Sequence, residues 1–413
     1  MAVPVPKALP LTSAPSSSPL KGQPVNTYLA ALQLHSYLLS HHTAQHALIG
    51  PDPGVRFNYR IGRFVKSYLP QITWRDHYYY LQTQAYWVMA NTSLHHMTGD
   101  MRYRTLADEC AQTIVARQRD DGAWDYPNPE WKGRIATVEG VWAAMGLLTA
   151  YQRNPLPQYL AGALRWHDYL IHQVGFQQLG DELAVNYFAG RAQARVPNNA
   201  TLVLALLALL TQTTGERSYL DPAPGLLTFL RRVQLTSGEL PYAVGGSDNP
   251  GYYRQHLQCY QYNAFQCLDL IAYYTSAGDE TVLPIIEGLL NFLSQGIADE
   301  GYAYYDCTQP KRRVMYHAAA LGAAFTQAAA LGMAQYREQA ERAFAYVMAA
   351  QRSDGSFQHS QQDYGLLADR RSYPRYLAMI LCHLLVRAAA TQAPQTGIQP
   401  QRGSSVQAYP TPA

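Results

Sequence analysis

Six polar side chains recur in this chain, each near the start of an apolar run of helical character. They are Gln84, Glu139, Asn199, Asn263, His317 and Arg375. Their separations of 55, 60, 64, 54 and 58 residues indicate a repeat. A polar group buried in such a run without a hydrogen-bond partner is costly. We therefore expect these six side chains to face one cavity, where they bind each other or a ligand.

Two acidic side chains could support hydrolysis of a glycosidic bond, a reaction that needs two carboxylates across that bond. Glu139 stands in the run IATVEGVWAAMGLL, where a carboxylate has few structural reasons to be present. Asp76 directly precedes another apolar run and is the best-placed partner. We predict Glu139 and Asp76 as the catalytic residues of a hydrolase.

The same set of residues could instead remove a proton next to a sugar carboxylate, as a lyase or an epimerase of uronates does. This reaction needs a base and a group that neutralises the growing enolate charge. His317 and its neighbour Tyr316 are the predicted bases. The predicted neutralising groups are Asn199, Asn263 and Arg375.

Further side chains around these residues are predicted to bind the substrate. Tyrosine occurs 32 times, and its apolar ring with a polar tip suits a half-wet cleft that stacks sugars. Arginines before the apolar runs, together with converging helix N-termini, favour an anionic ligand. The predicted substrate-binding residues are Gln84, Asn199, Asn263, Tyr262, Tyr373, Arg375, Arg134 and Trp124.

A structural interpretation stands beside each of these predictions. Asn199 could cap a helix together with Asn198. A lone histidine on an apolar helix, such as His317, is usually a satisfied core residue. Tyrosines can pad helix interfaces, and the arginines can pair with aspartates of the same loops.

The chain reads as six helical hairpins within residues 25–391. The first helix of each hairpin is amphipathic and belongs at the surface, whereas the second is apolar all round and belongs inside. The predicted outer helices span residues 28–42, 104–118, 158–173, 226–233, 283–293 and 338–351. The predicted inner helices span residues 77–95, 137–151, 199–210, 262–274, 316–331 and 376–389. The links into the inner helices are the long ones, so all six inner N-termini should open on one face.

A glycine turn recurs in these long links. QRDDGAW at residues 118–124 and QRSDGSF at residues 351–357 are its clearest copies. The predicted turn glycines are Gly122, Gly180, Gly238, Gly301 and Gly355, with Gly54 opening the series. Such a fixed period implies that each unit buries its apolar face on its neighbours.

Six hairpins with a Q-x-x-D-G-x-aromatic turn resemble the (α/α)6 toroid of six-hairpin glycosidases, polysaccharide lyases and sugar epimerases. The resemblance implies a single all-α toroid domain over residues 25–391. It also implies a carbohydrate-active enzyme that acts on an anionic, uronate-type poly- or oligosaccharide in a central cavity. Elimination, epimerisation and hydrolysis all fit this family of folds.

Two other functions are compatible with a toroid. Terpenoid cyclases and prenyltransferases are similar in architecture, and residues 118–124 and 351–357 resemble the Q-W repeat of the cyclases. The chain has no D-x-D-D acid motif, however, and Asp306-Cys307 with His317 depart from the spacing of the prenyltransferase zinc residues. The third interpretation is a non-catalytic toroid that binds a glycan or a partner.

Composition bounds the partners and cofactors. The net charge of +3 on 32 basic and 29 acidic residues does not indicate a nucleic-acid partner. The five cysteines are scattered without a CxxC pair, so neither a disulfide framework nor a structural zinc site is indicated. A phosphate-binding loop and a dinucleotide fingerprint are also absent. We therefore predict no cofactor and no metal.

The ends of the chain differ from its middle. Residues 1–24 are rich in proline and serine, and residues 392–413 have a similar composition, so both are predicted to be disordered. The start lacks the continuous apolar stretch of a secretion signal, and the run at residues 202–210 is too short to cross a bilayer. A cytoplasmic protein without a membrane span is expected, and no oligomeric state is assigned.

Overall fold

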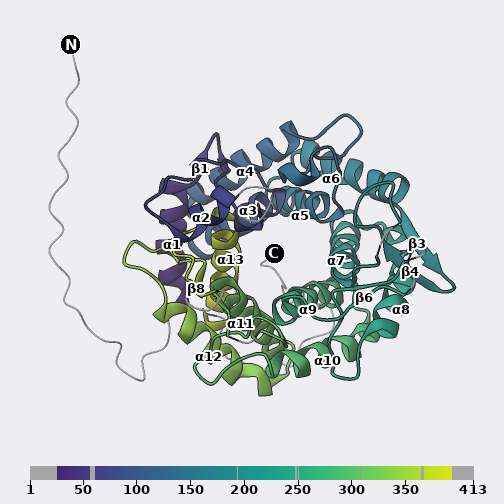
Figure 1. Ribbon diagram of the computed structural model, residues 1–413. Helices are drawn as coiled ribbons and strands as arrows, with labels where there is room; N and C mark the ends of the chain where they lie inside the picture. The colour runs from purple at the N-terminus through teal and green to yellow at the C-terminus, as the bar shows by residue number, and fades with distance from the viewer. Residues whose placement is uncertain are drawn as a thin grey trace, which may run out of the picture.

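Two concentric rings of helices form the protein (Figure 1). The computed structural model describes residues 26–55, 61–192, 194–246, 249, 251–309, 311–363 and 367–392. Within these residues twelve long helices alternate between an outer and an inner ring, and the predicted all-α (α/α)6 toroid is confirmed. The predicted disordered ends lie outside the described residues, apart from Gln392.

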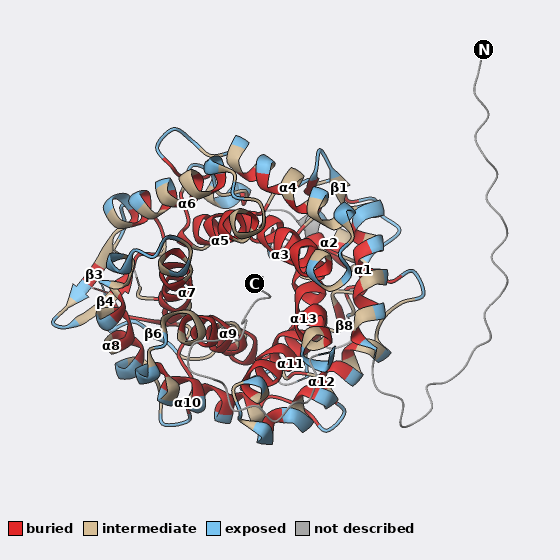
Figure 2. Ribbon diagram, turned by 180° about the vertical axis from the view of Figure 1, so that it is seen from behind, coloured by how far each residue is buried: buried red, intermediate tan, exposed pale blue. Residues whose placement is uncertain are grey.

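The inner ring is buried on nearly all sides, as Figure 2 shows. Its helices are α3 (Leu81–Thr98), α5 (Thr137–Arg153), α7 (Pro197–Thr214), α9 (Cys259–Ala277), α11 (Met315–Ala330) and α13 (Pro374–Gln392). Each packs on its two neighbours, and α13 packs on α3, so the ring closes. The apolar sequences of these helices are thus explained by burial from both the outer ring and the adjacent inner helices.

The outer ring covers the inner one and exposes its polar face. Its helices are α1 (Thr27–His41), α4 (Met101–Ala116), α6 (Pro157–Tyr169), α8 (Ala223–Val233), α10 (Leu283–Ser294) and α12 (Arg337–Ala349). All twelve predicted helices are therefore present, with ends shifted by a few residues. The N-terminal helix α1 packs on α13, the last inner helix, which completes the circle.

Short elements in the long links were not predicted. They are the helix α2 (Ile61–Tyr68), the antiparallel pairs β1 (Thr43–Ala44) with β2 (Ala47–Leu48), β3 (Phe176–Leu179) with β4 (Glu182–Val185), β5 (Ala243–Val244) with β6 (Tyr253–Arg254), and β7 (Arg313–Val314) with β8 (Ser360–Gln362). Two- to four-residue strands carry too little periodicity to be recognised in the sequence.

Small residues let helices approach closely, both between the two rings and within the inner ring. Gly140 on α5 faces the indole of Trp166 on α6, and a Cβ at Gly140 would lie 2.3 Å from that ring. Gly146 on α5 faces Ala85 on α3, where a Cβ would lie 3.0 Å from the Ala85 Cα. The described apolar side chains consequently form one almost continuous core around the toroid.

A glutamine in three of the repeated turns joins adjacent outer helices. Gln118 Nε2 donates to the carbonyl of Gly122 in its own turn at 2.8 Å and to that of Gly162 in α6 at 2.9 Å. The corresponding pairs are Gln234 with Gly238 and Ile285, and Gln351 with Gly355 and Ala30. We call this arrangement the Gln–Gly clasp; the last of the three binds α1 and so closes the outer ring.

Four turn glycines press against the next outer helix and have a positive φ. A Cβ at these positions would approach a backbone carbonyl oxygen at 2.0–2.6 Å, so only glycine fits. The four are Gly122, Gly238, Gly301 and Gly355, with φ between +85° and +91°. Gly180 is also a turn glycine with a positive φ, but it turns the β3–β4 hairpin, and a Cβ there would have nothing within 4 Å. The prediction was wrong for Gly54, which lies in a 3-10 turn without a positive φ.

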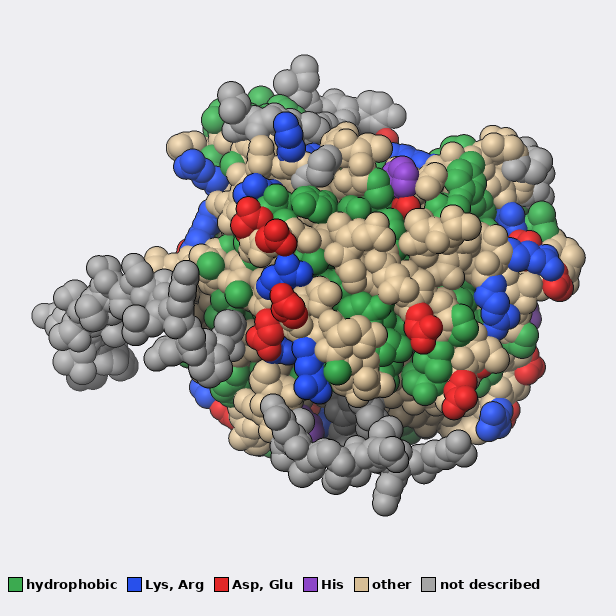
Figure 3. Space-filling model, turned by 90° about the horizontal axis from the view of Figure 1, so that it is seen from below, with side chains coloured by type: hydrophobic (Ala, Val, Ile, Leu, Met, Phe, Trp, Pro, Cys, Tyr) green, Lys and Arg blue, Asp and Glu red, His purple; other side chains and the backbone are tan. Residues whose placement is uncertain are grey.

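The surface shows no dominant charge on the face drawn in Figure 3, where Lys and Arg side chains are mixed with Asp and Glu. In the part of the chain that the structure describes, no helix combines the length and apolar character that crossing a bilayer requires.

The clasp predicts a difference between two glycines with similar backbone conformations. Gly238→Ala must move a neighbouring carbonyl as well as adopt a positive φ, whereas Gly180→Ala has only the positive φ to accommodate. We expect Gly238→Ala to lower the free energy of unfolding by about 2–4 kcal/mol and Gly180→Ala by about 1–2 kcal/mol. Urea denaturation of both variants measures this, and equal losses would contradict the packing argument.

Candidate functional site

A cavity, which we call the main cavity, lies where the N-termini of the six inner helices converge. Its volume is about 280 Å³, and each inner helix contributes at least one wall residue from its first turns. The remaining wall comes from the long links. The prediction that all six inner N-termini open on the long-loop face is therefore confirmed.

Tyrosines dominate the wall of the main cavity. They are Tyr80, Tyr126, Tyr187, Tyr242, Tyr262, Tyr316 and Tyr376, with Trp131 and Trp142 beside them. Burial raises the pKa of both Tyr187 and Tyr262, so their hydroxyl groups are neutral donors and acceptors at pH 7. Side-chain amides interrupt this aromatic surface at Gln82, Asn128, Asn198, Asn199, Gln258 and Gln261.

A second cavity of about 230 Å³ adjoins the first. The two share wall residues at Gly54, Gln258, Tyr316 and Tyr376, so they lie side by side, and we call them the two compartments. His317 lines the second compartment but not the first. Tyr316 separates them and donates its hydroxyl to Gln258 Oε1 at 3.3 Å.

Arg375 supplies the positive charge in the main cavity and is the only lysine or arginine in its described wall. Its Nε donates to Gln82 Oε1 at 2.9 Å, and Nη1 lies 3.6 Å from Asp52 Oδ2. The guanidinium carbon lies 4.5 Å from the centre of the Tyr80 ring and 5.5 Å from that of Tyr376. The two rings and Gln82 fix the orientation of the guanidinium, while its terminal nitrogens make no other described hydrogen bond.

Asn199 lines the main cavity from the first turn of α7. Its side chain is 1 % exposed, and neither amide atom has a hydrogen-bond partner among the described residues. The structural interpretation of Asn199 as a cap fails, because the N-cap of α7 is Val196, and Asn199 lies inside the helix with a side chain that makes no hydrogen bond to a described residue. A buried amide without a partner, facing a cavity, is suited to bind a polar ligand.

Asp269, which the sequence analysis overlooked, lies deeper in the same cavity. It is 3 % exposed and accepts a hydrogen bond from Thr201 Oγ1 at 3.1 Å. Burial raises the pKa of Asp269 well above its ordinary value, which favours the protonated, uncharged form of the carboxyl. The sequence could have indicated Asp269 as a site residue, because Asp269 interrupts the apolar run CLDLIAYY just as Glu139 interrupts an apolar run.

His317 is fully buried and stacks on Tyr305 with ring centres 5.4 Å apart. Neither ring nitrogen has a hydrogen-bond partner among the described residues. Burial, assisted by nearby Arg312, lowers the pKa of His317 to about 3, so the imidazole is neutral at pH 7. The structural interpretation of a satisfied core histidine does not hold for this side chain.

Three of the six predicted polar side chains support backbone instead of facing the cavity. Gln84 pairs with both backbone groups of Leu48 at 2.7 and 2.9 Å, and Asn263 pairs in the same way with Leu240 at 2.8 and 3.1 Å. Glu139 Oε2 accepts from the backbone N–H of Leu81, at the start of α3, at 2.6 Å. The expectation that all six face one cavity is therefore wrong at these positions.

Four other predicted residues also lie outside the walls of the two cavities. Asp76 accepts a hydrogen bond from Tyr78, and Tyr373 donates one to Asp369. The Trp124 indole donates to the carbonyl of Ile114 and packs by Trp166. Arg134 lies over the ring of Phe188. Of the predicted site residues, the structure thus brings together Asn199, Tyr262, Tyr316, His317 and Arg375.

A separate group of possible metal ligands, also overlooked, lies beside the main cavity. Glu239, His256, Cys259 and Cys307 place one ligand atom each within 4.8 Å of one another. They come from three segments of the chain, so no contiguous motif could reveal them.

Comparison with known proteins supports the architecture. No family model matches the sequence, and no curated protein matches it either. Solved structures do match in shape. A D-mannose isomerase has a TM-score of 0.67 at 12 % identity, over 90 % of this chain and 100 % of that one. The chain has the six-hairpin (α/α)6 toroid fold.

Two further matches have the same six-hairpin toroid fold. A possible member of the GH105 family from Salmonella enterica has a TM-score of 0.64 at 12 % identity, over 91 % of this chain and 99 % of that one. A cellobiose 2-epimerase from Bacillus thermoamylovorans has a TM-score of 0.61 at 13 % identity, over 75 % and 88 %. These low identities establish the fold and leave the reaction to the residues of the cavity.

Glu139 gives a pH-dependent prediction. Burial raises its pKa from 4.5 to about 7, so the unfolded chain ionises before the folded one does. The protonated carboxyl of Glu139 makes its full contribution to the free energy of unfolding below about pH 4.5, and this contribution is lost as the pH rises to about 7. The variant Glu139→Gln would not titrate at this position, and its amide keeps an oxygen for the Leu81 N–H. Relative to Glu139→Gln, the natural protein should lose about 3 kcal/mol of unfolding free energy over this range.

Denaturation of the natural protein and of Glu139→Gln at several pH values between 4.5 and 8 measures this difference. A difference that is constant with pH would contradict the burial argument. Because Glu139 lies outside the cavity walls, we also expect Glu139→Gln to leave the folded structure intact.

Proposed function

We propose that this protein is a carbohydrate-active enzyme that binds a uronate-type sugar in the main cavity and removes a proton next to its carboxylate. Elimination or epimerisation would follow from that step. The proposal is carried by one observation: Arg375 and the unpartnered amide of Asn199 line the same tyrosine-rich cavity.

The wall of the cavity supports a sugar as ligand. Sugars present apolar C–H faces and many hydroxyl groups, so they match aromatic rings that alternate with amides. The main cavity offers such a surface, with Tyr262 and Trp142 among the rings and Gln261 among the amides. The similarity in fold to a D-mannose isomerase and a cellobiose 2-epimerase agrees with a sugar ligand.

The position of Arg375 favours a sugar that carries a negative charge. A guanidinium binds a carboxylate through two parallel hydrogen bonds. Among the described residues, the terminal nitrogens of Arg375 have the 3.6 Å contact with Asp52 as their only polar contact. The N-termini of the inner helices add partial positive charge at the same place. A uronate carboxylate beside Arg375 and Asn199 would thus find both charge and hydrogen-bond donors.

The ionisable groups favour proton abstraction over hydrolysis. Hydrolysis needs two carboxylates, whereas Asp269 is the only acidic residue in the described wall of the main cavity, and burial raises its pKa. Proton abstraction needs an unprotonated base, and the imidazole of His317 is unprotonated at pH 7. A sugar that extends past Tyr316 into the second cavity would reach it, and the negative charge of the substrate would raise its low pKa. The enolate that forms would be stabilised by Arg375 and Asn199.

The aromatic wall gives the isoprenoid alternative one observation in its favour, because stacked rings also bind carbocations. Two observations count against this alternative. Asp269 is the only acidic residue in the described wall of the main cavity, and an apolar chain would leave the buried amide of Asn199 unpaired. Turnover of an isoprenoid diphosphate, with none of a uronate, would favour this alternative.

Two arginines provide a matched test of the anion site. Arg375→Lys retains the charge but loses the two-pronged geometry, and we expect kcat/KM on uronate-containing oligosaccharides to fall about 10²–10³-fold. Arg134→Lys is the control, since Arg134 lies outside the described cavity walls, and it should retain activity. The assay follows unsaturated or epimerised products, with neutral oligosaccharides as comparison substrates.

Equal activity of Arg375→Lys and the natural protein would remove the anion site from the proposal. Activity on neutral sugars alone, with new reducing ends, would replace proton abstraction by hydrolysis.

His317 is the predicted base, and its replacement tests the proton transfer. His317→Asn should lower kcat about 10²–10⁴-fold with little change in helix content. Because the pKa of His317 is lowered to about 3, activity should persist on the acid side of pH 6.5, the ordinary histidine value. Tyr316→Phe, assayed in parallel, separates the two neighbours; if it alone abolishes turnover, Tyr316 is the base.

A further inference from the structure

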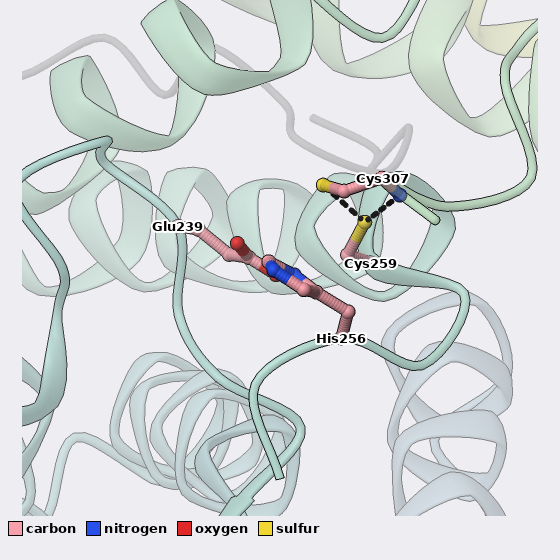
Figure 4. A group of neighbouring side chains, drawn as sticks. All are labelled: Glu239, His256, Cys259 and Cys307. Atoms are coloured by element: carbon pink, nitrogen blue, oxygen red, sulfur yellow. Dashed lines mark hydrogen bonds and ion pairs between the residues drawn. The ribbon is translucent and has the colours of Figure 1, made fainter. Parts of the chain in front are cut away.

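We propose that Glu239, His256, Cys259 and Cys307 bind one transition-metal ion, with Zn²⁺ the best match, at the rim of the main cavity. Figure 4 shows these four side chains pointing toward one another. One ligand atom from each lies within 4.8 Å of the other three. The site is separate from the sugar site proposed above and does not depend on it.

The fold gathers these residues from three segments. Glu239 directly follows the turn glycine Gly238, which the next outer helix holds in place. Cys259 is the first residue of α9, and His256 precedes it by three residues. Cys307 lies in the long link before α11, and its backbone N–H donates to Cys259 Sγ at 3.2 Å.

The distances fit four ligands that surround one ion after a small adjustment. Cys259 Sγ and Cys307 Sγ are 3.1 Å apart, and His256 Nδ1 is 3.0 Å from Glu239 Oε1. The sulfur separation exceeds the roughly 2.05 Å of a disulfide bond. Tetrahedral zinc with Zn–S bonds of about 2.3 Å sets the sulfurs about 3.8 Å apart, so the pair would open by less than about 1 Å.

Charge at the cluster favours a cation. Glu239 is 1 % exposed, and in the described part of the chain its only ion pair is with His256. Asp306 adds a second negative charge nearby. A buried carboxylate without a lysine or arginine partner, next to two thiols, is stabilised when a divalent ion neutralises it.

The backbone between two of the ligands has an uncommon conformation. Gln258, at φ 48° and ψ 42°, is in the left-handed region, which residues other than glycine rarely adopt. This turn links His256 to Cys259 and lets both side chains face Glu239 and Cys307. Backbone strain of this kind gathers at functional sites, and Gln258 also lines both cavities.

The donor set selects the metal. Two thiolates with an imidazole and a carboxylate match Zn²⁺ in tetrahedral geometry, whereas Mg²⁺ and Ca²⁺ require oxygen ligands. Bound there, the ion would tie the link before α9 to the link before α11 and fix the cavity wall at Gln258. Cys307 is exposed, so the ion can enter from solvent.

Metal analysis of the full-length protein tests this site. The chain is purified with a reductant, exposed to Zn²⁺ and desalted, and its zinc is quantified by mass spectrometry. We expect about one Zn²⁺ per chain. Replacement by Co²⁺ should give the intense near-ultraviolet absorption of a cobalt–thiolate bond.

Variants locate the ion. Cys307→Ala alters an exposed residue, so it should fold, and it should lose the cobalt–thiolate absorption or most of the zinc. Cys267→Ala is the control, because Cys267 lies on α9, as the ligand Cys259 does, but is buried and is not part of the cluster. It should retain about one Zn²⁺ per chain, provided its helical circular dichroism matches that of the natural protein.

Three results would overturn the proposal. One is reduced natural protein that holds no zinc after exposure to Zn²⁺. Another is full zinc retention in the double variant of Cys259→Ala and Cys307→Ala. The third is a Cys259–Cys307 disulfide together with no metal uptake once it is reduced, which would assign the pair a redox role.

Discussion

Closure of the outer ring is the constraint on which the rest of the structure depends. Each Gln–Gly clasp uses one side-chain amide to bind a carbonyl of its own turn and a carbonyl of the next outer helix. The turn glycine beside it lies too close to that helix for any side chain. The clasps join α4 to α6, α8 to α10 and α12 to α1, and the inner helices pack on one another around the whole ring, so their N-termini meet at one cavity. The chemistry proposed for the cavity follows from this convergence.

The buried polar residues of the inner helices are of two kinds: those that bind backbone groups of the links or helix ends, and those that have no described partner. Gln84 and Asn263 each satisfy both backbone groups of one link residue, and Glu139 satisfies the N-terminus of α3. These side chains do not line the cavity, but they hold in place the backbone segments around it. Asn199 and His317 have no such partner among the described residues, and they face the two compartments. The contrast separates residues that build the site from residues available to a ligand.

The sequence predicted the helices well because periodicity and burial are local signals. All twelve long helices, both rings and the face on which the cavity opens followed from apolar patterning and link lengths. The same pattern could not tell Gln84 from Asn199, since both stand at the start of an apolar run and their difference lies in contacts with distant links. The sequence did not predict the metal-ligand cluster either, because the turns that bring its residues together have no periodic pattern. These residues are Glu239, His256, Cys259 and Cys307. Gly180 misled the repeat analysis, because a hairpin turn and a clasp turn both require a positive φ.

The central claim concerns where a uronate carboxylate binds, and a crystal structure of the protein with a uronate-containing oligosaccharide tests it most directly. Our account predicts that the carboxylate lies within hydrogen-bond distance of the Arg375 guanidinium and the Asn199 amide, with a sugar ring against the tyrosines of the main cavity. A sugar bound outside this cavity, or one whose carboxylate points away from Arg375, would contradict it.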